Sequence, residues 1–275
     1  MRARVLMTAL AALVLSIWSA AAGAADRAAL RDFLEVTGFD VAITSMQQGA
    51  MAGPGIAGDA PDDFGLQYTR LAEQVFDPDL MLERALDMMA AILPDDLLEH
   101  GAGFYASDLG QRLVVAENQS HLVDDDLKFA EGEAILEALV EANPDRVDDY
   151  GAMNDAIGGI ESSVRAVAEI QLRYLLAAIS AGSVDLAYSE DELRALIEAQ
   201  IPDIRQNVAV YSILGAAYTY QGFSDGEMRA YRAALEAPEM RQVYEILNAI
   251  QFQIMAERYE ALAEALAGLA PQQDI

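Results

Sequence analysis

Apolar residues recur every three or four positions along most of this chain, which is the spacing of one face of an α-helix. Alanine, leucine and glutamate dominate the same segments, and no convincing alternation of period two indicates a strand. The sequence therefore predicts an all-α protein, built as a bundle of antiparallel helices. Three apolar faces carry this prediction: Leu30, Phe33 and Leu34; Leu82, Leu86, Met89 and Leu93; and Val243, Ile246, Leu247, Ile250, Ile254, Leu262 and Leu266.

Proline, glycine and aspartate divide the predicted helices from one another. Residues 49–65 are rich in Gly, Pro and Asp and predict a loop. This loop contains a match to G-x-G-x-x-G at 53–58, but no strand precedes it and the aspartates after it would repel phosphate. We therefore interpret it as a loop and not as a nucleotide site. Five prolines each stand near the start of an apolar segment, where a missing N–H removes no helical hydrogen bond: Pro78, Pro94, Pro144, Pro202 and Pro238.

Three consecutive aspartates, Asp124 to Asp126, precede a predicted helix over 127–140. Carboxylates at the start of a helix accept hydrogen bonds from its free N–H groups and complement its dipole. A metal site would need further ligands from other elements. The pattern therefore favours a helix cap over a metal site.

The stretch GFYASDLGQRL at 103–113 predicts a corner between two helices. Phe104 and Tyr105 end a helix that begins near Asp95, and Ser107 is a good N-cap for the next helix. Gly110 has no side chain, so it allows the two helices to approach closely. Serine catalysis would need a base and an oxyanion hole beside Ser107, and the sequence shows neither.

Two pairs of segments match each other at a distance. Residues 93–113 align with 223–243 at an offset of 130 positions, and residues 28–38 align with 191–201 at an offset of 163. The matches predict two related helical units, a first at 26–122 and a second, degraded copy at 123–275. Chance matching of segments rich in alanine and leucine is the alternative.

The corner sequence resembles the F-Y-x-S-P-x-G-[QK] signature of a family of small exported bacterial proteins, catalogued as a domain of unknown function. Asp108 stands where that family usually has proline. Residues 223–266 resemble a second copy that lacks the aromatic pair and the glycine. The residues that carry the signature are Phe104, Tyr105, Ser107, Gly110 and Gln111, and the prediction for them is a structural role.

The order of elements over residues 28–121 also resembles this family. In that family a helix of the L-x-E-x-x-G type is followed by a loop, a helical region ending in an acidic helix, the signature and a long final helix, and here Leu34-Glu35-Val36-Thr37-Gly38 stands near the start. The resemblance implies an exported, all-helical fold. It implies no reaction, because none is established for the family.

The N-terminus predicts a secretory signal at residues 1–25. Arg2 and Arg4 precede an apolar run over 5–18, and small residues over 20–25 fit cleavage after Ala24 or Ala25. The alternative is a retained membrane anchor, but the apolar run is shorter than the roughly 20 residues that span a bilayer. The prediction is a periplasmic or secreted protein with no stable membrane anchor.

Composition excludes several classes of function. The chain has no cysteine, which excludes disulfides, thiolate metal sites and cysteine nucleophiles. Its net charge is −28, and loss of Arg2 and Arg4 with the signal takes it near −30. Such a surface repels phosphate backbones and anionic lipids, so we expect no nucleic-acid partner.

Histidine is scarce, since only His100 and His121 occur. Neither belongs to an H-E-x-x-H motif, and a zinc or pH-sensing role for His121 is the alternative to a position on a polar helix face. The many carboxylates form no distinctive pair. The sequence therefore predicts no catalytic residue, no cofactor-binding residue and no metal ligand.

The segment Tyr211-x-x-Leu214-Gly215-x-x-Tyr218 resembles one tetratricopeptide unit, but no neighbouring repeat follows at the period of about 34 residues. The pattern favours a helical hairpin closely packed at Gly215. A tetratricopeptide-like peptide-binding module remains an alternative.

These observations predict an exported, non-enzymatic binding or interaction module of the bacterial envelope. Its partner would be an envelope protein, a peptide or an apolar ligand. We expect a groove between the two units, lined by Tyr174, Tyr211, Tyr218 and Phe252. Two alternatives stay open: a metal-dependent or carboxylate-based hydrolase, and a structural module that forms a homo-oligomer.

Overall fold

The computed structural model describes residues 27–51, 65–182 and 188–267, and every regular element in these ranges is an α-helix. The all-α prediction is confirmed. The predicted signal segment and the G-x-G-x-x-G match lie outside the described residues. After a helix over 27–37 the elements are α2 (Phe39–Thr44), α3 (Met46–Met51), α4 (Gly65–Val75), α5 (Pro78–Ile92), α6 (Asp95–Tyr105), α7 (Asp108–His121), α8 (Asp125–Ala142), α9 (Pro144–Ala156), α10 (Gly159–Ala181), α11 (Glu190–Thr219), α12 (Asp225–Leu235) and α13 (Pro238–Ala267).

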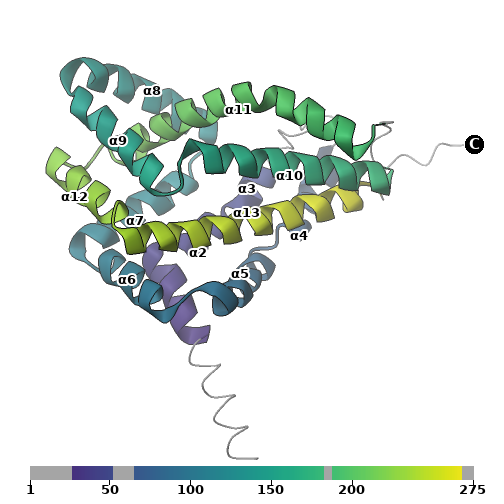
Figure 1. Ribbon diagram of the computed structural model, residues 1–275, viewed down its shortest axis with the longest axis horizontal. Helices are drawn as coiled ribbons and strands as arrows, with labels where there is room; N and C mark the ends of the chain where they lie inside the picture. Colours follow the sequence, from purple (N-terminus) through teal and green to yellow (C-terminus); the bar gives the residue numbers. More distant parts are fainter. Residues whose placement is uncertain (1–26, 52–64, 183–187, 268–275) are drawn as a thin grey trace, which may run out of the picture.

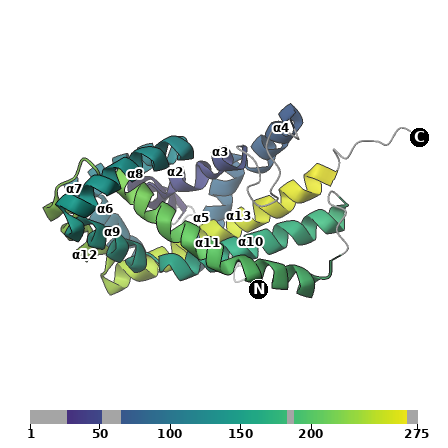
Figure 2. The ribbon, with the colours of Figure 1, turned by 90° about the horizontal axis from the view of Figure 1, so that it is seen from above.

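Three long helices organise the molecule (Figure 1). Helices α10 and α13 lie side by side and run in one direction, and α11 runs back along α10 in the other. Seen from above, these helices extend together toward one end of the molecule, whereas α6, α7, α8, α9 and α12 gather at the other end (Figure 2). Within the described ranges, no helix has the length and apolar character needed to cross a membrane.

One hydrophobic core crosses the boundary that the sequence predicts at residue 122. Phe33 and Ile43 from the first unit belong to the same cluster as Met228 and Leu262 from the second. The reason is α13, which packs against α4, α5 and α6 as well as against α10. The two predicted units therefore share this core.

Most of the predicted helix starts are confirmed. Pro78, Pro144 and Pro238 are the first residues of their helices, and Pro94 is the N-cap of α6. Asp124 caps α8, because its carboxylate accepts hydrogen bonds from the N–H groups of residues 126 and 127 at 3.1 and 3.2 Å. The capping interpretation of the three aspartates is thus confirmed.

The prediction for Pro202 is wrong, because this proline lies inside α11 and not near a helix start. A proline within a helix removes one backbone hydrogen bond. Pro202 is exposed, and α11 packs against both α8 and α10, so tertiary contacts stabilise the helix despite the missing bond.

Close packing at Gly215 is also not observed. A Cβ atom built at Gly215 would lie 3.9 Å from the nearest side chain, which is ordinary contact. The close approach occurs instead at Gly132 of α8, where a Cβ would lie 2.3 Å from the carbonyl oxygen of Leu214. The glycine that brings α8 and α11 together therefore belongs to α8.

The two helix pairs that the internal match relates begin and end at equivalent positions. Helix α6 spans Asp95–Tyr105 and α12 spans Asp225–Leu235, while α7 begins at Asp108 and α13 at Pro238. All of these bounds differ by the same 130 residues. The chain thus uses a similar helix–corner–helix arrangement in both predicted units.

Candidate functional site

The 103–113 segment forms the predicted corner between α6 and α7. The Ser107 hydroxyl accepts a hydrogen bond from the N–H of Gly110 at 3.1 Å, as an N-cap does. A Cβ atom at Gly110 would lie 2.4 Å from the carbonyl oxygen of Phe104, so only glycine fits here. Gln111 donates to the carbonyl oxygen of Tyr105 at 2.7 Å. These three contacts explain most of the signature as local structure.

Tyr105 does more than close the corner, because its hydroxyl reaches a group of buried tyrosines from the second half of the chain. It lies 3.0 Å from the hydroxyl of Tyr231 and also hydrogen-bonds that of Tyr244. The ring of Phe104 stacks on Tyr231 with centroids 5.8 Å apart. We call Tyr105, Tyr220, Tyr231 and Tyr244 the tyrosine cluster.

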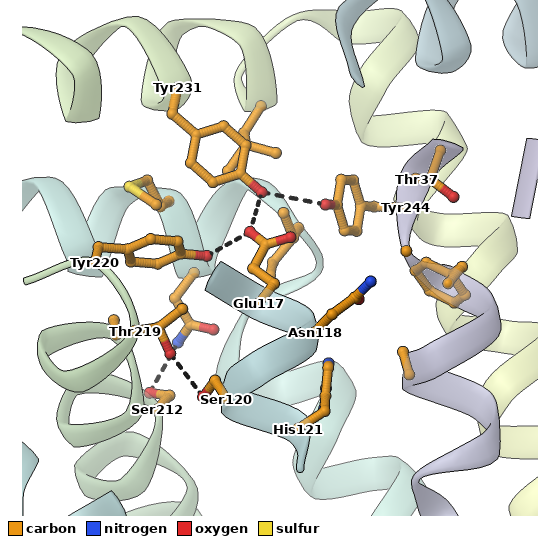
Figure 3. A pocket seen from close by; sticks show the side chains of 18 of the residues that line it. Thr37, Glu117, Asn118, Ser120, His121, Ser212, Thr219, Tyr220, Tyr231 and Tyr244 are labelled. Carbon is orange, nitrogen blue, oxygen red and sulfur yellow. Dashed lines mark hydrogen bonds between the residues drawn. The ribbon is translucent and has the colours of Figure 1, made fainter. Parts of the chain in front are cut away.

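At the centre of this cluster lies the carboxylate of Glu117, on α7. Its Oε1 accepts hydrogen bonds from the hydroxyl of Tyr220 at 2.7 Å and from that of Tyr231 at 2.8 Å. Figure 3 shows the two tyrosines reaching this one oxygen from different sides. The donors come from α12 and from the C-terminal end of α11, and they hold the carboxylate in a fixed orientation.

Burial shapes the protonation of this group. It raises the pKa of Glu117 above the ordinary value, although the two tyrosine hydrogen bonds oppose the shift. Burial, and next the neighbouring Glu117 charge, raise the pKa values of Tyr220 and Tyr231 well above their usual range. The tyrosines therefore remain protonated donors at any physiological pH.

A cavity of about 350 Å³ adjoins the tyrosine cluster. His121 lies one turn beyond Glu117 on the same helix, lines the cavity and is exposed, so the cavity reaches the surface there. Segments far apart in the sequence contribute to the lining, which comprises Thr37, Gly38, Phe39, Ala42, Glu117, Asn118, Ser120, His121, Tyr150, Met153, Asn154, Ile157, Ser212, Ala216, Thr219, Tyr220, Tyr231, Leu235, Tyr244, Asn248 and Gln251.

The second oxygen of Glu117, Oε2, points away from Tyr220 into the space that the lining residues surround (Figure 3). No residue in the described ranges donates a hydrogen bond to it. Among those residues, the one fully enclosed side-chain atom without a partner is Oδ1 of Asp40, so Oε2 is not sealed from the cavity. The site thus presents one oriented carboxylate oxygen with capacity for a donor.

Gly38 shapes the opposite wall. It ends the first helix with φ +74°, a conformation that favours glycine. A Cβ atom here would also lie 2.6 Å from the side-chain oxygen of Asn118. The glycine of the L-x-E-x-x-G segment therefore lets the N-terminal helices lie against α7 beside the cavity.

The aromatic residues predicted to line a groove do not line this cavity. Tyr174 is buried against Tyr259, with ring centroids 6.1 Å apart. Tyr211 is half exposed beside Phe129. Tyr218 and Phe252 are absent from the lining as well. The cavity is built instead from Tyr150 and from three members of the tyrosine cluster.

The two histidines do not come together. His100 lies on α6, and His121 lies at the end of α7 on the cavity wall. Loss of hydration, and next the nearby Lys128, lower the pKa of His121. In the parts of the chain that the structure describes, no group of three His, Asp or Glu side chains is placed to hold a metal ion.

Sequence reasoning missed Glu117 and its donors. One indication was available: Leu113 and Glu117 are four residues apart on one helical face, so a charged residue occupies a core-facing position. The donors could not be assigned in the same way. Tyr231 lies 114 residues from Glu117, and no local pattern connects them.

No family model, no curated protein and no solved structure matches the chain. The likeness of residues 28–121 to the exported family therefore stays a prediction. The function must be argued from the site itself.

Proposed function

We propose that this protein is an exported, helical binding protein that holds a small ligand in the cavity beside Glu117. The observation that supports the proposal is the hydrogen bonding of the Glu117 carboxylate. Two tyrosine hydroxyls orient its Oε1, while its Oε2 faces a cavity of about 350 Å³ without a donor. A partly satisfied buried charge costs stability, and a ligand that donates to it removes this cost.

The make-up of the lining supports binding of a molecule with both polar and apolar parts. Met153, Ile157 and Ala216 provide apolar surface, and Asn154 and Thr219 provide neutral hydrogen-bonding groups. Such a mixture is typical of pockets that bury a small organic molecule and orient it through a few polar contacts. Export is proposed from the predicted signal at residues 1–25.

Native mass spectrometry of the protein, purified without denaturation or added ligands, tests the proposal. We expect a mass that corresponds to cleavage after Ala24 or Ala25 and a small molecule that is carried through purification. A library of small metabolites screened by thermal shift is the second measurement, because a ligand that binds the folded state raises the melting temperature.

A cavity-filling variant makes the test specific. Ala216 lines the cavity, so Ala216→Leu places bulk within it. Ala134 is exposed on α8, and Ala134→Leu is the matched control. We expect the first variant to lose the carried molecule and its thermal shift, and the second to keep both. Retention of the same molecule by Ala216→Leu, or the absence of any ligand from both measurements, would contradict the proposal.

A further inference from the structure

We propose that the ligand is a small organic cation with an N–H group, a protonated amine, and that Glu117 is its counter-ion. This inference rests on the proposed function, since it assigns the chemical class of the ligand in the same cavity. The feature that carries it is a negative charge with a free acceptor oxygen, in a lining without a permanent positive charge.

Among the residues that the structure describes, the lining contains neither arginine nor lysine. Arg146 is buried and is not part of the lining, and its charge is paired with Asp225 at 3.1 Å. Its guanidinium lies over the ring of Tyr150 and hydrogen-bonds the Tyr150 hydroxyl at 3.0 Å and the carbonyl oxygens of Tyr220 and Phe223 at 2.9 and 2.8 Å. His121 is the one ionisable base that borders the cavity, and its surroundings favour the neutral form. The Glu117 carboxylate thus has no cation beside it among the described residues.

The hydrogen-bond pattern selects the sign of the ligand. Burial alone would favour the protonated form of Glu117, but Tyr220 and Tyr231 donate to its carboxylate, and a cation beside Oε2 would stabilise the charged form further. An anionic ligand would be repelled by this charge. A neutral alcohol would give one hydrogen bond but leave the charge uncompensated, whereas an ammonium group supplies both the donor and the charge.

The remaining lining suits an organic cation. The aromatic side chain of Tyr244 lines the cavity, and aromatic rings attract cations through their electron-rich faces. The apolar side chains of Met153 and Ile157 can contact the hydrocarbon part. The chain as a whole carries a net charge of −28, which raises the local concentration of cations and repels anions.

Isothermal titration calorimetry with matched probes tests the inference. Ethylamine and benzylamine are the cations, ethanol and benzyl alcohol their neutral equivalents, and acetate and benzoate the anions. We expect at least one amine to bind at least about tenfold more tightly than its alcohol. The two carboxylates are expected not to bind.

Two substitutions assign the preference to Glu117. Glu117→Gln keeps the shape of the side chain and removes its charge, so we expect the amine to fall to within about twofold of the alcohol. Glu133 is exposed on α8, and Glu133→Gln is the control that should behave like the unmodified chain. The amine-to-alcohol comparison on the unmodified chain decides the ligand class even if Glu117→Gln does not fold.

Three results would overturn the inference: an alcohol or carboxylate that binds as tightly as the amines, an amine preference that survives in Glu117→Gln, or no binding of either amine up to about 10 mM. The Ala216→Leu variant separates these from failure of the proposed function. If that variant loses a carried molecule that is not an amine, the cavity binds a ligand of another class and only the cation assignment is wrong.

Discussion

The corner between α6 and α7 and the corner between α12 and α13 have equivalent helix bounds but different chemistry. Gly110, with no space for a side chain, corresponds to Met240, which is fully buried. Ser107, the N-cap of α7, corresponds to Ala237. The same arrangement is therefore compatible with a glycine and a capping serine in one place, and with a large apolar side chain and a proline start in the other.

The difference extends along the second helix of each pair. Glu117 of α7 corresponds to Leu247 of α13, and Leu247 is almost completely buried in the core. Tyr105 corresponds to Leu235, which is also buried. A helix in this arrangement can thus complete its packing with hydrocarbon alone. Glu117 and the Tyr105 hydroxyl are therefore not required by the corner, and for Glu117, which lines the cavity, this supports a role in binding.

The largest expected effect is a loss of stability on substitution of Gly110. Gly110→Ala should lower the free energy of unfolding by about 3 kcal/mol, because the new Cβ meets backbone and not a flexible side chain. Gly103 on α6 has open space around it, so Gly103→Ala is the control and should raise stability by up to about 1 kcal/mol. Urea unfolding measures both. If Gly110→Ala and Gly103→Ala changed the free energy of unfolding equally, Gly110 would have space for a side chain, as the equivalent position Met240 does.

The next effect tests whether Glu117 serves binding more than folding. Glu117→Leu introduces the residue found at the equivalent position of α13. We expect the free energy of unfolding to fall by at most about 2 kcal/mol, because the buried charge is removed but the hydroxyls of Tyr220 and Tyr231 lose their shared acceptor. Affinity for the better-binding amine, measured by calorimetry, should fall at least about tenfold. If Glu117→Leu does not fold, its affinity cannot be compared with that of the unmodified chain. That result would mean that the corner needs this carboxylate for folding.

Smaller changes in stability, of opposite sign at the two corners, are expected when the helix caps are exchanged. Ser107→Ala should cost about 1 kcal/mol because it removes the hydroxyl that accepts from Gly110. Ala237 lies just before Pro238, and Ala237→Ser should gain up to about 1 kcal/mol if the second corner accepts the same cap. Thermal unfolding of the two variants and of their combination measures this. If Ala237→Ser lost stability as Ser107→Ala does, the two corners would differ in backbone geometry.

The smallest effect depends on pH. Burial raises the pKa of Glu117 in the folded protein above its value in the unfolded chain. Between these two values the folded state holds a proton that the unfolded state has lost, so this residue lowers stability as pH rises. The stability of Glu117→Gln relative to the unmodified chain should therefore increase from about pH 4 to about pH 7.

Urea titrations of both proteins at several pH values measure this difference. Groups with lowered pKa values, such as Glu227 beside Arg112, are common to both proteins and cancel in the comparison. Glu133→Gln is again the control. A difference between Glu117→Gln and the unmodified chain that shrinks as pH rises would contradict the raised pKa.

Features that depend only on neighbouring residues, such as helix caps, could be predicted from the sequence. Ser107 and Asp124 were recognised as caps because a cap is a contact over two or three residues. Gly110 was recognised because it stands directly after a helix start. The prediction for Pro202 is wrong because its helix packs against α8 and α10, and a local rule does not include these contacts.

The cavity could not be predicted, because its parts come from distant segments. Tyr105 and Tyr231 are 126 residues apart, and Glu117 and Tyr220 are 103 apart. Aromatic residues in a helical protein are usually core, so no sequence pattern separates Tyr220 and Tyr231 from Tyr174. The folded arrangement alone shows which tyrosines donate to a carboxylate.

The cavity lining comes from segments far apart in the sequence, and this has a consequence for local opening of the structure. Thr37, Glu117, Met153, Thr219 and Tyr244 border one space, so an occupant would tie together elements that otherwise open independently. Amide protons near residue 37 and near residue 244 should then exchange with deuterium more slowly in the same proportion when the space is filled. The occupant would act as a removable piece of the interior.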